Sequence, residues 1–103
     1  MKLIEWLLKM ENNVVWITGS NSLIDLRLAI HGFSAALRFL GDKSPDPFYP
    51  GFQRYIEKVY GLQGKTAKSW ARIILDHSKD EDEAMKSFYK YLKIYAKKEG
   101  YIK

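Results

Sequence analysis

The chain has 103 residues, of which 47% are hydrophobic, 28% charged and 15% aromatic, and it contains no cysteine. At this length we expect a single domain, residues 1–103; the composition is too apolar for a disordered chain, and the lack of cysteine excludes disulfide scaffolds, thiolate metal sites and cysteine nucleophiles. The net charge of +5 comes entirely from residues 51–103, where 12 basic residues outnumber 7 acidic ones, whereas residues 1–50 hold five of each.

The sequence shows no membrane-spanning or export segment. Glu5 interrupts the apolar N-terminal stretch where a signal peptide needs an unbroken run, and no small-residue cleavage site follows. No stretch approaches the roughly 18 consecutive apolar residues of a spanning helix. We therefore expect a cytoplasmic protein with no membrane partner.

The first predicted element is a short amphipathic helix over residues 2–11, which Asn12 and Asn13 interrupt. Residues 14–17, Val-Val-Trp-Ile, form a strand-like run, and no second run of similar β character exists to pair with it. We interpret this run as an extended connector whose Trp16 side chain fills part of the core.

A long helix is predicted from Ser22 to about Leu40, with Gly41 ending it. The Ser22 hydroxyl can accept a hydrogen bond from the first turn, where Asp25 opposes the positive end of the helix dipole. Apolar residues cover two faces: Leu23, Leu26, Ile30, Phe33, Leu37 and Leu40 on one, and Ile24, Leu28, Ala35 and Phe39 on the other. The polar residues form a narrow strip: Arg27, His31, Ser34 and Arg38. A helix this apolar belongs in the middle of the fold.

Two shorter helices are predicted next, after a proline-rich loop over residues 42–50. One begins at Pro50, whose missing N–H is not needed in a first helical turn, and ends at Gly61. After a turn, the other opens at Thr66 and passes through Trp70 to His77.

The last predicted helix begins with an S-x-x-E capping box, Ser78 to Glu81, and ends at Gly100. With the preceding elements it gives an all-α fold, a compact bundle of about five helices with a central apolar helix and one short extended segment.

Catalytic motifs are missing from the sequence. Its two histidines, His31 and His77, fall in no metalloprotease pattern, and no nucleophile elbow or phosphate-binding loop occurs. Residues 17–22 resemble a phosphate turn superficially, but one glycine without a following lysine favours a plain turn and helix cap. We therefore expect no enzyme, no cofactor and no metal site.

Three surface features are candidate contacts for a partner. Arg27, His31 and Arg38 on the long helix offer two forked guanidinium donors to carboxylate or phosphate and one imidazole. The last helix carries a lysine face that includes Lys86 and Lys90, and an acidic first turn. That turn consists of Asp80, Glu81, Asp82 and Glu83.

Each of these features also has a simpler structural explanation. The strip on the long helix can pair with neighbouring helices, because arginine is kept inside a fold only when it is paired. A lysine face is typical of any amphipathic surface helix, and carboxylates are favoured in a first helical turn by the helix dipole. Both signs of charge on one helix suit a protein partner better than a nucleic acid, whose phosphates the carboxylates would repel.

The order of several short motifs resembles a group of small bacterial immunity-like proteins of the toxin/immunity, contact-dependent inhibition type. These motifs span nearly the whole chain: Glu5-Trp6-Leu7, Trp16-Ile17-Thr18-Gly19, Ser22-Leu23, Gly32-Phe33, Gly51-Phe52, Tyr60-Gly61, Ser69-Trp70, Ile73-Ile74, and Ala84 with Phe88 and Tyr91. They are core and turn positions rather than a site. The chain departs from the group at residues 12–15, Asn-Asn-Val-Val, where its relatives tend to have a Pro-Gly turn.

The resemblance implies a non-enzymatic immunity protein that binds and neutralises a cognate bacterial toxin. Its expected partner-binding residues are those of the three surface features: Asp80, Glu81, Asp82, Glu83, Lys86, Lys90, Arg27, His31 and Arg38. If the toxin is a nuclease, the acidic turn is expected to enter its basic cleft. The alternative is a small basic helical module that binds nucleic acid through the excess positive charge of the second half.

Overall fold

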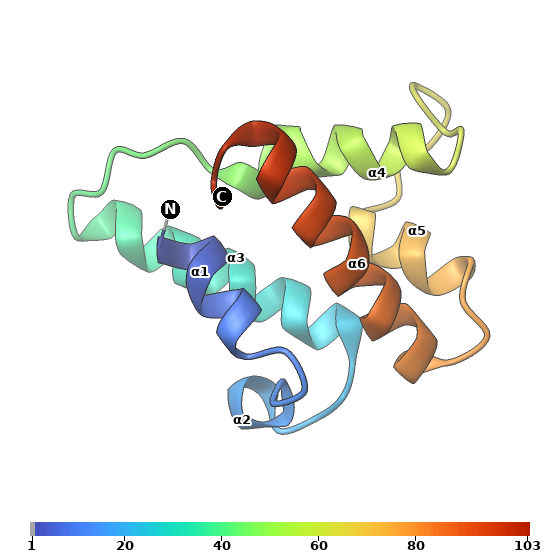
Figure 1. The fold of residues 1–103 in the computed structure, drawn as a ribbon, viewed down its shortest axis with the longest axis horizontal. Helices are drawn as coiled ribbons and strands as arrows, with labels where there is room; N and C mark the ends of the chain where they lie inside the picture. Colours follow the sequence, from blue (N-terminus) through green and yellow to red (C-terminus); the bar gives the residue numbers. More distant parts are fainter. Residues whose placement is uncertain (1) are drawn as a thin grey trace.

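The computed structural model describes residues 2–103, with side chains from residue 3 onward, and Figure 1 shows its ribbon. The elements in chain order are α1 (Lys2–Lys9), α2 (Val15–Thr18), α3 (Leu23–Phe39), the π-helical segment η1 (Pro47–Phe52), α4 (Gln53–Val59), α5 (Trp70–Asp76) and α6 (Glu81–Glu99). Residues 2–103 form six α-helices and no β-strand, which confirms the predicted all-α fold.

Helix α6 lies at the centre of the arrangement. It runs diagonally across the view of Figure 1 and contacts α1, α3 and α5. Its buried residues are Ala84, Met85, Phe88, Tyr89, Leu92, Tyr95 and Ala96. In contrast, α3 buries only Leu23, Leu26, Ile30 and Ser34. The sequence predicted that both apolar faces of the helix over residues 22–40 are buried. For the second face this was wrong, since Leu28 is 56% exposed and Phe39 is 91% exposed.

Aromatic rings fill the core between η1, α5 and α6. The fully buried Phe52 ring meets the rings of Trp70 and Phe88 edge to face, at centroid distances of 5.3 and 5.9 Å. Trp70 also stacks on Phe88 at 5.0 Å. Edge-to-face and offset-stacked geometries are those that aromatic pairs prefer, and each adds about 0.5–1.5 kcal/mol to the burial of the rings. These contacts fix the angle at which α6 crosses α5 and η1.

The extended connector predicted for residues 14–17 was wrong. Residues 15–18 form α2, a single helical turn that ends at Gly19 with a φ of 74°. Because no second strand is available to pair with this segment, its backbone groups form local hydrogen bonds instead. One of these joins Trp16 N–H to the Asn13 carbonyl at 3.0 Å. Trp16 is 81% exposed instead of filling the core, and Val14 is buried there in its place.

Two predicted helix starts were also wrong. The helix expected from Thr66 begins at Trp70, because the Ser69 hydroxyl accepts from Arg72 N–H (3.2 Å) and so provides the N-cap. The last helix is capped by Asp80 rather than Ser78. The Ser78 hydroxyl instead donates to the Ile74 carbonyl (2.7 Å) at the end of α5. Both segments contain several residues that can cap a helix, and the sequence alone does not show which of them does so.

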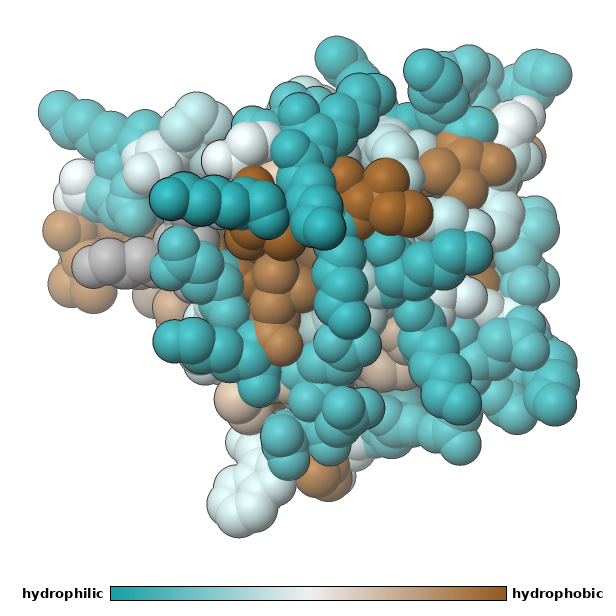
Figure 2. Space-filling view, viewed as in Figure 1, coloured by the Kyte–Doolittle hydropathy of each residue, from teal (hydrophilic) through white to brown (hydrophobic). Residues whose placement is uncertain are grey.

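Other predicted boundaries were confirmed. Ser22 caps α3 by accepting from Asp25 N–H at 3.2 Å, and Gly100 ends α6 with a φ of 80°. Within η1, Tyr49 has extended backbone angles, so helical geometry resumes at Pro50, where a helix start was expected. No helix in residues 2–103 combines the length and the apolar character needed to span a bilayer. On the side seen in Figure 2, hydrophilic side chains dominate and hydrophobic ones form separate patches.

Gln53 joins α4 to the segment that leads into α5. Its amide nitrogen donates to the Glu57 carboxylate (2.8 Å) and to the Lys68 carbonyl (3.0 Å), and its amide oxygen accepts from Trp70 N–H (2.7 Å). Two of these bonds, to the Lys68 carbonyl and from Trp70 N–H, hold residues 68–70 against α4, and the bond to Glu57 lies within α4.

Replacing Gln53 with alanine should lower the free energy of unfolding by about 1–3 kcal/mol, because the partly buried Trp70 N–H loses its acceptor. Chemical denaturation of both proteins measures the difference. Gln63→Ala is the matched control, since Gln63 is exposed in the turn after α4 and should tolerate the same truncation. Equal losses for the two variants would contradict the bridging role.

Candidate functional site

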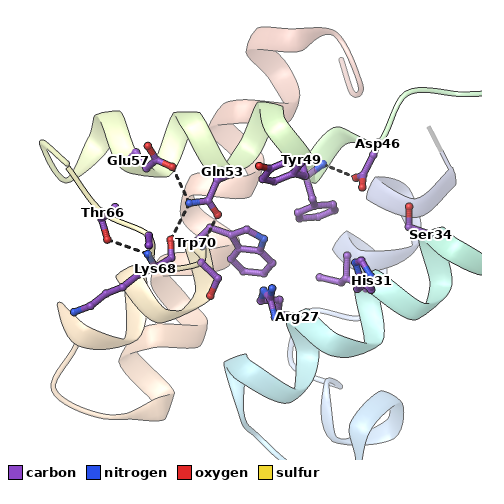
Figure 3. Close-up of a pocket in the computed structure, with 14 residues that line it drawn as sticks. Arg27, His31, Ser34, Asp46, Tyr49, Gln53, Glu57, Thr66, Lys68 and Trp70 are labelled. Carbon is purple, nitrogen blue, oxygen red and sulfur yellow. Dashed lines mark hydrogen bonds between the residues drawn. The ribbon is translucent and has the colours of Figure 1, made fainter. Parts of the chain in front are cut away.

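A pocket of about 470 Å³ opens between α3, the η1–α4 segment and residues 66–70 (Figure 3). Arg27 and His31 reach it from α3, and Tyr49 and Gln53 border it from the opposite side. The indole of Trp70 lies between these two walls in Figure 3. The pocket thus has an aromatic floor and polar sides.

Some charged groups around this pocket have hydrogen-bond or ion-pair partners, and others have none among the described residues. Asp46 accepts from Phe48 N–H and Glu57 from the Gln53 amide, each at 2.8 Å, and Lys68 forms an ion pair with Asp76 at 2.7 Å. Arg27 and His31 make no hydrogen bond or ion pair within residues 3–103. The pairing with neighbouring helices that would have explained this strip is therefore not found in the part of the chain that the structure describes.

The solvent side of α3 carries an apolar stripe next to these groups. Leu28, Gly32, Ala35 and Phe39 are spaced i, i+4, i+7 and i+11, which places them on one side of the helix, and all four are exposed. We call this stripe the open α3 face. Arg27, His31 and Arg38 follow along one edge of it by the same helical spacing.

Neither a close contact nor the backbone conformation requires a glycine at position 32 within residues 3–103. A Cβ atom built at Gly32 meets no other atom within 4 Å, and its backbone does not need the left-handed conformation. In contrast, a Cβ atom at Gly51 would collide with the Tyr95 hydroxyl. Glycine inside a helix costs about 1 kcal/mol relative to alanine. The open α3 face therefore carries a destabilising residue that no internal contact requires.

The acidic turn lies elsewhere and is used within the fold. A Glu81 carboxylate oxygen accepts from Leu23 N–H at 3.1 Å, and Asp82 accepts from the Asn21 amide at 2.6 Å, so both fasten the start of α6 to the start of α3. Asp80 accepts from Glu83 N–H, and Glu83 accepts from Lys79 N–H. All four carboxylates have partners, and the link to α3 could not be inferred from local sequence.

The lysines of α6 are exposed, as their positions on the helix predicted. Lys90 lies over the Tyr91 ring at 5.4 Å, and Lys93 pairs with Glu11 at 2.7 Å. Lys86 and Asp82 line a second pocket, of about 340 Å³, which shares no lining residue with the first. The expected partner-binding residues therefore fall on two separate surfaces, and Arg38 lines neither pocket.

Tyr89 is the unusual residue of the second pocket. It is 1% exposed, and its hydroxyl has no hydrogen-bond partner among residues 3–103. Burial is the main cause that raises its pKa far above the usual tyrosine value, so the hydroxyl stays protonated. Tyr95 differs, because its buried hydroxyl donates to the Pro47 carbonyl at 3.1 Å, and burial raises its pKa to about 12.

Metal ligands do not gather in the described part of the chain. Residues 3–103 contain no group of three or more histidine, aspartate or glutamate side chains that could hold an ion. No model of a protein family, no curated protein and no solved structure matches this chain.

The sequence pattern predicts Arg27, His31 and Arg38 as candidate contacts, but it did not predict that the apolar stripe beside them is exposed. It assigned Leu28, Ala35 and Phe39 to a second covered surface, because apolar residues indicate burial in general and do not name the element that covers them. Gly32 was the available signal, since a glycine in the middle of a strong helix needs a reason.

Tyr89→Phe should leave the free energy of unfolding unchanged or raise it by up to about 1 kcal/mol, because it removes a buried hydroxyl without a partner. Tyr95→Phe should lower it by about 1 kcal/mol, because the Pro47 carbonyl loses its donor. Thermal or chemical unfolding of the two variants measures the difference. Equal destabilisation would mean that the Tyr89 hydroxyl has a partner.

Proposed function

We propose that this chain is a non-enzymatic binding protein, and more specifically an immunity protein that binds and neutralises a cognate bacterial toxin in the cytoplasm. The observation that carries the proposal is the open α3 face, an apolar helix surface that is exposed within residues 3–103 and edged by basic groups without a hydrogen bond or ion pair in that range. The specific role of immunity protein rests on the resemblance in core and turn motifs across the chain.

The composition of this surface favours a protein partner. Leu28 and Phe39 are large apolar side chains, 56% and 91% exposed, on the same side of α3. Complete burial of such a side chain contributes about 1.5–3 kcal/mol, so a partner that covers both gains a substantial part of a binding free energy. Arginine and tyrosine are enriched at interface centres, and Arg27 and the 71% exposed Tyr49 border the neighbouring pocket.

A nucleic-acid-binding module is the second candidate, supported by the exposed lysines of α6. Lysine ammonium groups can bind phosphates without reading sequence. The acidic first turn of the same helix counts against this function, because Asp80, Asp82 and Glu83 are exposed beside the lysine face and would repel phosphates.

The two candidates differ in how binding responds to salt. If the lysine face binds nucleic acid, affinity for a duplex or single-stranded oligonucleotide should fall by about tenfold or more between low and physiological salt. For an immunity protein we expect little oligonucleotide affinity at either salt concentration. Fluorescence anisotropy with labelled oligonucleotides measures it, and tight binding at physiological salt would overturn the protein-binding proposal.

A co-expression assay tests the immunity proposal. The product of the gene immediately upstream is induced in a bacterial host with and without this chain, and viable cells are counted. We expect loss of viability with the upstream product alone and recovery when the chain is present. Leu28→Asp should abolish recovery, because it places a charge on the open α3 face, whereas Lys97→Glu on the exposed side of α6 should retain it. A toxic upstream product that the chain does not neutralise would contradict immunity.

A further inference from the structure

We infer that the element that docks on the open α3 face is an amphipathic helix of a partner protein whose carboxylates lie along Arg27, His31 and Arg38. This inference rests on the protein-binding function proposed above and specifies the chemistry of the partner. It depends on three observations: the shape of the face, the glycine within it and the charges along its edge.

The shape of the face suits a helix. Large side chains stand at its two ends, Leu28 and Phe39, and the small residues Gly32 and Ala35 lie between them. The stripe from Leu28 to Phe39 is about three helical turns long, and its low middle part, Gly32 to Ala35, is about one turn long. Helix axes pack 8–10 Å apart depending on the side chains between them, and small residues allow the closest approach.

Gly32 points to a partner outside the chain. The space above its α-carbon is empty, so alanine or leucine would fit there and would stabilise the helix in the isolated protein. The absence of a side chain at this position becomes useful only when another backbone approaches closely. A docked helix that crosses α3 at Gly32 provides that backbone.

The charge along the edge selects an acidic partner. Neither Arg27 nor His31 has a hydrogen bond or ion pair within residues 3–103, and the same holds for Arg38. Asp25 lies toward the opposite edge by helical spacing and already accepts from the Ser20 hydroxyl at 2.8 Å. Asp46 and Glu57 line the neighbouring pocket, but they accept from Phe48 N–H and from the Gln53 amide and form no ion pair with the basic edge. Within residues 3–103 no carboxylate pairs with this edge, so a partner's carboxylates would supply the complementary charge.

Other occupants fit the face less well. An antiparallel second copy related by a two-fold axis would place the basic edge of one α3 against the same edge of the other, with like charges together. A nucleic acid would place its phosphates next to Leu28 and Phe39 rather than burying them. An acidic amphipathic helix can cover the apolar stripe with its own apolar side and pair its carboxylates with the basic edge.

The experiment is a selection from a displayed library of helical peptides about four turns long. The peptides share an apolar stripe, their flanking positions vary among glutamate, glutamine and lysine, and the full chain serves as bait. We expect enrichment of peptides with glutamate along one flank. Binding of an enriched synthetic peptide, measured by calorimetry, should weaken about tenfold or more in Gly32→Leu and in the double variant Arg27→Gln/Arg38→Gln. Lys97→Gln is the control and should bind as the unchanged chain does.

Gly32→Leu separates docking from folding. Its thermal midpoint should rise, because leucine is a better helix former in open space, while peptide binding falls. Selection of lysine-flanked peptides, selection of no peptide, or unchanged binding to Gly32→Leu would each overturn the inference. A dimer in sedimentation that Gly32→Leu dissociates would also overturn it, in favour of a second copy.

The two proposals can fail separately. If the selected peptides behave as expected and the chain still does not neutralise the upstream product, the immunity role fails and the docking chemistry stands. If the chain neutralises that product and Gly32→Leu neutralises it equally well, the immunity role stands and the docking inference fails.

Discussion

The packing of aromatic rings between η1, α5 and α6 is the interaction on which the other elements of this fold depend. Phe52, Trp70 and Phe88 contact one another with ring centroids 5.0–5.9 Å apart. They hold the central helix α6 against two segments from the middle of the chain. Once α6 is fixed, its other sides accept α1 and α3, with which it is in contact.

The start of α6 also determines how α3 lies. Glu81 accepts from Leu23 N–H at the first turn of α3, and Asp82 accepts from Asn21 just before it. On its covered side, α3 places Phe33 against Trp6 of α1, with the rings stacked 4.9 Å apart. Within residues 3–103 the remaining side of α3 stays exposed, and it forms the open α3 face. The acidic turn thus contributes to the candidate site indirectly, by positioning the helix that carries it.

Most of the helices could be predicted from local sequence, but several of their first residues could not. Ser22, Gly61 and Gly100 act where they were expected, because capping and left-handed glycine depend on a few neighbouring residues. The starts at Ser69 and Asp80 were missed, because several residues nearby were able to cap. Val14 to Ile17 was assigned to an extended segment on β propensity, which means little without a partner strand.

The sequence by itself determined the all-α class, the amphipathic α6, the approximate span of α3 and the cationic residues along it, because these follow from periodicity and side-chain chemistry. Only the tertiary structure decided which side of α3 is covered, that Trp16 lies outside the core, and that the acidic turn bonds to a distant helix start. Burial depends on neighbours from elsewhere in the chain. A pattern of apolar residues indicates that a helix face tends to be buried. Whether another part of the chain buries it depends on how the other helices are arranged.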